Sequence, residues 1–180
     1  SFETQVGPVT TPPQYEKILG YIDIAKGEGA NCVLGGGPAG PDMGGGKYFV
    51  QPTVFTGVEN KMRIAQEEVF GPVLSVIKFK DEDDAAAIAN DVMYGLGSGV
   101  WTQSIKRATT MAQRIRAGTV WVNTYRAVSF TMPFGGYKSS GIGRENGQDA
   151  INEYLQTKSV WISNAPGGGN PFVMKTAADE

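Results

Sequence analysis

The feature of this sequence that most constrains its fold is the regular alternation of two residue patterns between residues 73 and 123. Three apolar segments have the length of strands: residues 73–79, 98–102 and 119–123. Between them, small and apolar residues recur at helical spacing, with Asp81 and Ser104 placed as N-caps and Gly118 as a stop. This order predicts parallel strands joined by right-handed crossovers. We therefore expect an α/β fold, a layered, mostly parallel sheet flanked by helices.

A further helix is expected near the N-terminus. Thr11 is placed as an N-cap, Pro12 suits the first helical position, and Gln14 could close a capping box. Apolar residues then recur at helical spacing, at Tyr15, Ile18, Leu19, Ile22 and Ala25. Gly27 or Gly29 would end this helix.

Less regular segments follow this helix. Residues 32–34 have the pattern of a short buried strand, and residues 35–46 are a loop by composition. Residues 48–55 look extended. Pro52 lies within them and cannot donate to a ladder, so it points to the edge of a sheet.

The C-terminal part predicts a loop, a helix and a late strand. Residues 124–143 are a long segment rich in glycine and aromatic residues, a helix is expected over about 145–156, and a strand over 159–162. The tail after Ser163 is expected to be loose. A strand that arrives after the domain is complete needs a partner, and the sheet edge of another subunit would supply one. We therefore expect a homo-oligomer.

Composition excludes several classes of function. The chain has no histidine, so a histidine base or a histidine metal site is excluded within it, and no metal site is expected. Its net charge is −2 and its basic residues are scattered, which argues against nucleic acid. The apolar runs are too short for a membrane span, and the first residues do not resemble a signal peptide. A single cysteine excludes an internal disulfide and favours a cytoplasmic setting.

Three motifs that suggest chemistry fail on their surroundings. Residues 44–47 (GGGK) resemble a P-loop, but Tyr48 stands where a magnesium-binding Ser or Thr is needed. The glycines of residues 141–147 resemble a dinucleotide fingerprint, yet no strand precedes them, and a tight turn into a helix is favoured. Cys32 has no neighbouring cation to stabilise a thiolate, so a buried, unreactive cysteine is favoured.

The run Glu67-Glu68-Val69-Phe70 leaves two interpretations open. Two carboxylates beside an aromatic residue, just before a strand, could accept hydrogen bonds from a sugar diol and cover a flat ring. Alternatively, the carboxylates are a solvated acidic helix end and Phe70 belongs to the core.

Four strings, in order along the chain, resemble the aldehyde dehydrogenase superfamily: QEEVFGPVLSVIKF (66–79), AGTVWVN (117–123), PFGGYKSSGIGRENG (133–147) and EYLQTKSVWI (153–162). The resemblance runs from about Gly7 to Ser163. Several motifs in matching order make it far more specific than any one of them alone.

The resemblance implies that this chain is one part of a longer enzyme. Residues 1–156 would be the C-terminal part of the catalytic domain, residues 157–163 an oligomerisation strand, and residues 164–180 a flexible tail. The nucleophilic cysteine, the general-base glutamate and the asparagine that helps to bind the oxyanion lie upstream in the family. The chain would therefore lack the reactive centre and would need the missing N-terminal part of the same enzyme.

The resemblance also assigns cofactor-binding positions. Glu68 matches the glutamate that accepts hydrogen bonds from the nicotinamide ribose of NAD or NADP, and Phe70 matches an aromatic residue packed near that ring. Gln14 and Lys17 match positions that contact the same ribose and its surroundings. Residues three apart on a helix share one side, so both could face the cofactor.

Substrate-binding positions follow in the same way. Phe134 matches an aromatic residue near the aldehyde entrance, and Val128 lies in the loop that lines this tunnel, where apolar side chains select a substrate by shape. Arg126 and Val128 differ from the acidic or aromatic residues of relatives, so no particular aldehyde is implied. Arg126 would favour acidic aldehydes, or else it is a surface arginine.

Three polar positions near the C-terminus complete the assignment. Glu145 matches a glutamate that supports the upstream base; alternatively, it complements the dipole of the following helix. Arg144 is expected to tie this helix to neighbouring segments. Gln156 stands where some relatives carry a glutamate that links arginines across a dimer.

Two functions remain open at this point. The first is NAD(P)-dependent oxidation of an aldehyde to a carboxylic acid by the parent enzyme, with this chain inactive alone. The alternative is a truncated, non-enzymatic relative that acts in oligomer assembly. The sequence chooses neither the aldehyde, nor NAD against NADP, nor dimer against tetramer.

Overall fold

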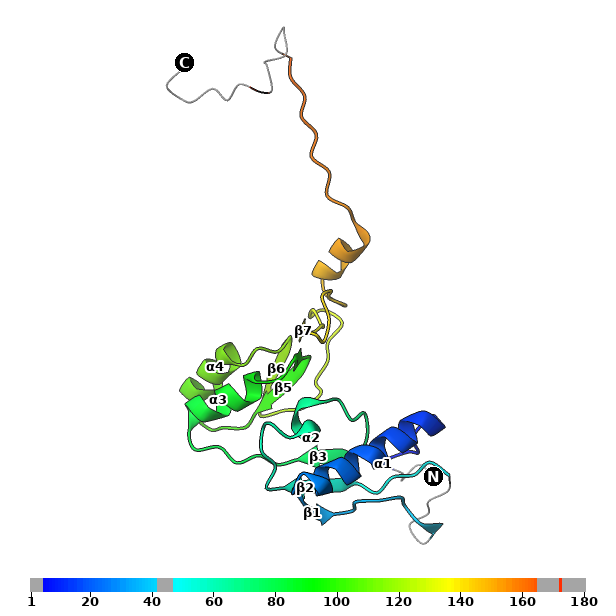
Figure 1. Cartoon of the computed structure of the whole chain (residues 1–180). Coiled ribbons are helices and arrows are strands. Elements are labelled where there is room, and N and C mark those ends of the chain that lie inside the picture. Colours follow the sequence, from blue (N-terminus) through cyan, green and yellow to red (C-terminus); the bar gives the residue numbers. More distant parts are fainter. Residues whose placement is uncertain (1–4, 42–46, 165–171, 173–180) are drawn as a thin grey trace.

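A helix laid along a small mixed sheet forms the first part of the molecule (Figure 1). A computed structural model of the chain describes residues 5–41, 47–164 and 172. Helix α1 (Pro12–Gly27) begins and ends as predicted. Thr11 makes no side-chain capping bond, and the Gln14 amide instead donates to carbonyl groups of a distant turn. The predicted capping box is therefore wrong, because Gln14 has a tertiary partner.

The sheet beside α1 has the strand order β1-β2-β3, with β1 (Asn31–Leu34) antiparallel and β3 (Val73–Ser75) parallel to β2 (Thr53–Thr56). Pro52 does not mark an edge, since it precedes the central strand and the ladder starts at Thr53. The prediction of a buried strand at residues 32–34 is wrong on burial, because Val33 and Leu34 are exposed at the sheet edge.

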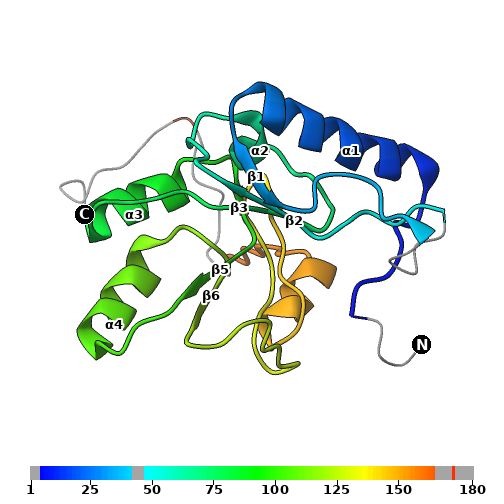
Figure 2. The same cartoon turned by 90° about the horizontal axis from the view of Figure 1, so that it is seen from below.

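The core of this region lies between α1 and the sheet. Phe55, Ile18 and Ile22 are almost completely buried, and they pack with side chains from the loop around the short helix α2 (Arg63–Gln66). Burial of large apolar side chains is the main stabilising term in folding, at about 1.5–3 kcal/mol for each. Figure 2 shows α1 running along this sheet, while α3 and α4 lie beside the second strand group.

The second strand group follows the predicted alternation. Helix α3 (Glu82–Asn90) leads through β4 (Tyr94–Gly95) to β5 (Gly97–Val100), and α4 (Ile105–Arg114) leads to β6 (Thr119–Val122). Strands β5 and β6 are parallel, as predicted. Both predicted N-caps are confirmed, since Asp81 accepts from two backbone amides of α3 and Ser104 from one of α4.

The α/β class is confirmed, but the described strands do not form one parallel ladder. Strand β3 ends at Ser75 rather than at Phe79, and it pairs with β2 but not with β5. Ile77 and Phe79 line a hollow of about 650 Å³ together with Val100 and Trp101. Among the described strands, β5 pairs with β6 alone, so the two parallel pairs belong to separate sheets. Antiparallel pairing of β4 with the two-residue strand β7 (Tyr137–Lys138) adds to the mixed character.

The C-terminal part differs most from prediction. The helix expected over 145–156 is a six-residue 3₁₀ helix, η2 (Asp149–Tyr154). Asn146 and Gly147 both have positive φ angles, which an α-helix cannot include, so a helix cannot begin at residue 145. The strand expected over 159–162 has no ladder partner within the described parts of the chain, and residues 155–164 run away from the body as an exposed segment (Figure 1). The expected tail falls almost entirely outside the described residues.

Candidate functional site

The turn between α2 and β3 presents two of the predicted cofactor residues, Glu68 and Phe70, outward. Phe70 is 70% exposed and has a φ of +55°, a left-handed conformation that costs a non-glycine residue roughly 1–2 kcal/mol. A Cβ atom on Gly71 would lie 2.7 Å from side-chain atoms of buried Ile18, so glycine is required where the turn approaches α1. The turn is therefore a strained loop pressed against a helix, and Phe70 is not a core residue.

Gln14 holds this strained turn from α1. Its Nε2 atom donates to the carbonyl oxygens of Val69 at 2.9 Å and of Phe70 at 3.3 Å. Two adjacent carbonyl groups are thereby tied to one half-buried amide, across 55 residues of sequence. The amide nitrogen of Gln14, predicted to contact a cofactor, is engaged with the backbone of the turn that carries Phe70.

A second anchor lies at the start of the turn. We call Tyr21, Arg63 and Glu67 the Glu67 clamp. The Arg63 guanidinium donates to both carboxylate oxygens of Glu67 at 2.8 Å, and the Tyr21 hydroxyl donates to Glu67 Oε2 at 2.6 Å. Bidentate pairs of this kind fix orientation as well as adding energy. The carboxylate is 38% exposed, so its contribution is moderated by solvent.

The electrostatics of the clamp follow from these bonds. Hydrogen bonds from Arg63 and then from Tyr21 hold the pKa of Glu67 down at about 2. The hydrogen bond to Glu67 raises the pKa of Tyr21 above its usual 10. Glu67 therefore stays ionised and Tyr21 stays protonated over the whole physiological range. Of the two neighbouring carboxylates, Glu67 and Glu68, it is therefore Glu67 that stabilises the folded turn.

Glu68, in contrast, has no hydrogen bond or ion pair within the residues that the structure describes. It is exposed, and with Phe70 it lines a hollow of about 500 Å³. A carboxylate with unused acceptor sites beside an exposed aromatic ring can receive a pair of hydroxyl groups under a flat ring. Lys17 lies elsewhere on α1, with its ammonium 5.7 Å from the centre of the Tyr21 ring. The structure thus groups Gln14, Glu68 and Phe70, and places Lys17 on the Glu67 clamp.

The predicted substrate residues form another group. Val128 and Phe134 line one hollow of about 470 Å³, together with Trp121 and Met132. The Trp121 indole donates to the carbonyl of Ala127 at 2.8 Å, which ties the Val128 loop to β6. These side chains are largely apolar, and such a hollow sorts ligands by shape more than by charge.

Phe134 and Glu145 are joined through their backbones. Each amide donates to the carbonyl of the other at 2.7 Å, and both residues line a hollow of about 660 Å³. Arg144 donates to the carbonyls of Gly136 and Gly143, and its guanidinium lies 5.5 Å from the centre of the Tyr137 ring. Arg144 therefore ties the turn before η2 to β7 and its loop, close to its predicted role.

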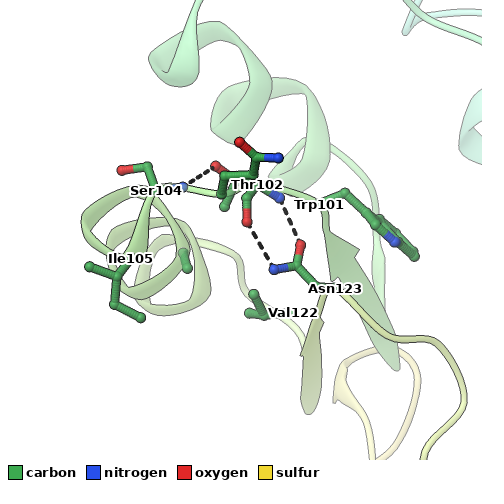
Figure 3. A pocket seen from close by; sticks show the side chains of 8 residues that line it. Trp101, Thr102, Ser104, Ile105, Val122 and Asn123 are labelled. Carbon is green, nitrogen blue, oxygen red and sulfur yellow. Dashed lines mark hydrogen bonds between the residues drawn. The ribbon is translucent and has the colours of Figure 1, made fainter.

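A hollow at the carboxyl ends of β5 and β6 contains none of the residues predicted to bind cofactor or substrate (Figure 3). Ligands of open α/β sheets often bind at such ends. Here the Asn123 amide accepts from the Thr102 amide and donates to the Thr102 carbonyl, both at 2.8 Å. The asparagine thus cross-links the two strand ends, and its side chain is already used.

Two further features concern other chemistry. Cys32 is half-buried, and its thiol donates weakly to the carbonyl of Leu34 at 3.4 Å, so it is less buried than predicted. Within the described ranges, no group of three or more Asp, Glu or Cys side chains gathers as metal ligands would. No helix in those ranges has the length and apolar character needed to cross a membrane. Gly44, Gly45 and Gly46, which suggested a P-loop, lie outside the described residues.

The comparison with known families decides the relationship. The model of the family described as "Aldehyde dehydrogenase family" matches residues 1–160. The chain belongs to the aldehyde dehydrogenase family.

Similar members of the aldehyde dehydrogenase family come from several bacteria. The chain is 53% identical to acetaldehyde dehydrogenase 2 of Cupriavidus necator over 91% of its residues and 32% of that protein. It is 51% identical to an aldehyde dehydrogenase of Vibrio cholerae over 90% of its residues, again 32% of that protein. The chain thus spans about a third of the length of the curated relatives it matches.

Solved aldehyde dehydrogenase structures share the fold. An indole-3-acetaldehyde dehydrogenase in complex with NAD+ superposes with a TM-score of 0.82 at 46% identity, covering 89% of this chain and 32% of that one. An apo betaine aldehyde dehydrogenase from Staphylococcus aureus gives 0.88 at 40% identity, covering 97% and 35%.

Within this aldehyde dehydrogenase framework, sequence reasoning missed the Glu67 clamp. The four-residue spacing of Arg63 and Glu67 is a readable helical ion-pair signal. Tyr21 carries no such signal, because it lies 46 residues away and meets Glu67 only in the folded chain.

Proposed function

We propose that this chain is the C-terminal part of the catalytic domain of an NAD(P)-dependent aldehyde dehydrogenase that oxidises an aldehyde to a carboxylic acid. Residues 1–156 supply one wall of the cofactor and substrate pockets, and residues 157–163 are an oligomerisation strand. The supporting observation is that Glu68 and Phe70 are exposed and unused on a turn that other side chains hold in place. The family match supports the interpretation of this turn as a binding element rather than a solvated helix end.

The cofactor residues are Glu68, Phe70, Gln14 and Lys17. The Glu68 carboxylate accepts hydrogen bonds from the two ribose hydroxyls of NAD or NADP, and Phe70 packs against the adjoining ring. This contribution is one of positioning. The bound cofactor supplies the acceptor for the hydride that the aldehyde loses. The NAD+ complex of the similar indole-3-acetaldehyde dehydrogenase supports this assignment.

On the substrate side, Phe134 and Val128 enclose the small-molecule aldehyde, and Glu145 supports a base from outside this chain. The nucleophile and the general base belong to the missing N-terminal part of the same enzyme. Consistent with this proposal, Cys32 is half-buried on β1 and bonded to a backbone carbonyl, away from both hollows. We place the enzyme in the cytoplasm.

The terminal segment favours assembly into a homo-oligomer. Val160, Trp161 and Ile162 are 70%, 95% and 83% exposed, and an extended apolar segment of this kind gains most from pairing with another sheet edge. The same observation supports the second candidate function, a truncated non-enzymatic relative that acts in assembly.

One assay separates the two functions. The purified 180-residue chain is mixed with NAD+ and a panel of aldehydes, and NADH is followed by absorbance, while NAD+ affinity is measured by calorimetry. We expect no NADH, and weak binding that Glu68→Gln lowers by about fivefold to tenfold through loss of a charge-assisted hydrogen bond. Glu16→Gln, at an exposed position on α1, is the matched control and should change nothing.

The outcomes are distinct. Absence of NAD+ binding to the wild-type chain would favour the assembly function. NADH formation by the isolated chain would contradict the proposal that the nucleophile lies elsewhere. Reading the gene upstream of Ser1 adds an independent check, because the enzyme proposal expects a coding region that supplies a cysteine nucleophile.

A further inference from the structure

The turn that carries Glu68 and Phe70 is held by two separate anchors. Gln14 holds the carbonyls of Val69 and Phe70, and the Glu67 clamp fixes the residue just before Glu68. Next to these anchors, Val69 packs against the first core and Gly71 fits closely against Ile18 of α1. The anchors therefore enclose the two exposed side chains from both ends.

We propose that Gln14 and the Glu67 clamp are positioning residues, which hold the turn so that Glu68 and Phe70 point outward in a fixed geometry for a ribose and its attached flat ring. The proposal rests on the cofactor role proposed above and adds to it a device for preorganisation. This role does not depend on contact with the ligand, so for Gln14 it adds to the cofactor contact proposed above.

Phe70 has a backbone conformation that is unfavourable for a residue with a side chain. A phenylalanine with a φ of +55° persists only where the surroundings impose that conformation. Gln14 supplies the constraint, because its amide is bound to the carbonyls on both sides of the Phe70 nitrogen and Cα. Without Gln14 the backbone would relax to a negative φ, and the exposed ring would turn away from its present direction.

The adjacent carboxylates of Glu67 and Glu68 differ in their hydrogen bonding. Glu67 is fully engaged, by a bidentate arginine and a tyrosine hydroxyl, whereas Glu68 has no partner within the described residues. Since neighbouring side chains in an extended stretch point in opposite directions, fixing Glu67 inward directs Glu68 outward. The depressed pKa of Glu67 supports this picture, because the anchor stays charged at neutral pH.

The clamp is also tied to α1 as a whole. The Arg63 amide donates to the Glu28 carboxylate at 3.0 Å, and the Arg63 guanidinium lies 5.7 Å from the centre of the Tyr21 ring. Gln14, Tyr21 and Glu28 thus contact the α2 region along the length of α1 and just beyond its end. Helix α1 therefore supports both the beginning and the end of the turn through side-chain hydrogen bonds.

The test uses NMR on the full 180-residue chain with Gln14→Ala and Tyr21→Phe. A positive φ gives a strong intraresidue amide-to-Hα contact, which we expect to weaken at Phe70 in Gln14→Ala and to persist at Lys138, which also has a positive φ. Amide exchange at Glu67 and Val73 should accelerate by roughly tenfold in each variant, as loss of one hydrogen bond to a carbonyl or a carboxylate implies. Amides of α4 report on global stability and should not change.

Matched controls separate positioning from general destabilisation. Tyr15→Phe, also on α1, removes a hydroxyl group that makes no hydrogen bond among the described residues. Gln113→Ala removes an exposed glutamine of α4. Both should leave the Phe70 signal and the exchange rates unchanged. Unchanged Phe70 conformation and exchange in Gln14→Ala and Tyr21→Phe would overturn the proposal.

Nicotinamide mononucleotide is the binding probe, because it carries the ribose and the flat ring with one phosphate and lacks the adenosine half of the cofactor. We expect the variants to weaken its binding threefold to tenfold while the controls do not. If the turn loosens but the wild-type chain binds no mononucleotide, the anchors are supported as positioning residues and the proposed cofactor role fails. If the mononucleotide binds equally to wild type and to loosened variants, the positioning proposal is overturned and the cofactor role stands.

Discussion

The two strand groups of this chain are built from the same parts and differ in how well they are covered. Around β1–β3, α1 buries Phe55, Ile18 and Ile22 almost completely. Around β5–β6, the buried side chains are the smaller set Ala86, Met111 and Ile115, and every residue of β6 remains half-buried. Parallel strands are normally covered on both faces. The difference indicates that the first group has the more complete core of its own, and that the second has more of its strand surface left partly uncovered.

The largest expected effect sharpens this contrast. Phe55→Ala should lower the free energy of unfolding by about 3–5 kcal/mol, because it leaves a cavity at the centre of the better-packed group. Chemical denaturation followed by circular dichroism measures it. If the variant does not fold, Phe55→Leu gives a smaller loss that can still be measured. A loss of unfolding free energy smaller than that of Met111→Ala, in the second group, would show that the second group has the better-packed core.

Met111→Ala probes the second group and should lower the free energy of unfolding by about 2–3 kcal/mol, less than Phe55→Ala. Met111 lines the hollow beside α3 and α4, so part of its surroundings can collapse or hydrate after truncation. Denaturation under the same conditions provides the comparison. A loss as large as that of Phe55→Ala would show that the second core is as complete as the first.

Asp81→Ala tests the N-cap of α3 in the second group and should lower the free energy of unfolding by about 1 kcal/mol. Asp81 Oδ1 accepts from the amides of Asp83 and Asp84, so alanine leaves two donors at the start of α3 without their partner. Asp81→Asn keeps the acceptor and should restore most of the stability. An equal loss in both variants would assign the effect to charge instead of capping.

The smallest effect concerns pH and the first group. The pKa of Glu67 is lowered to about 2 from an ordinary value of 4.5, so its stabilising contribution is complete above about 4.5 and is lost as the pH falls towards 2. The stability difference between wild type and Glu67→Gln should therefore shrink over this range, as thermal unfolding at a series of pH values would show. Glu68→Gln removes a neighbouring charge without an ion pair, and should show no comparable trend. A trend of equal size in both variants would exclude the clamp as its cause.

Local signals in the sequence account for what was predicted correctly. Asp81 and Ser104 act within one helical turn, and the alternation that they punctuate gave the α/β class and the parallel β5–β6 pair. Gln14 was expected from local pattern to close a capping box, but its amide nitrogen binds a turn 55 residues away, and the cofactor contact that the resemblance implies stays a prediction. The helix expected at residue 145 failed because Asn146 and Gly147 adopt positive φ angles that composition alone did not reveal.

The site was predicted in part for the same reason. Glu68 and Phe70 could be proposed from adjacent residues and a family resemblance, and the structure finds them exposed on one turn. Tyr21 could not, because only the folding of α1 against α2 brings its hydroxyl to Glu67. Anchors that act over long sequence separations are the part of a site that local patterns do not contain.

The central claim is that this chain forms a cofactor-facing wall whose contact points are Glu68 and Phe70. Titration of the ¹⁵N-labelled 180-residue chain with NAD+ tests it most directly. We expect amide shift changes concentrated at Glu68, Phe70 and Gly71, with none at Thr102 or Asn123 in the hollow at the carboxyl ends of β5 and β6. Changes centred on Thr102 and Asn123, with the turn unaffected, would contradict it.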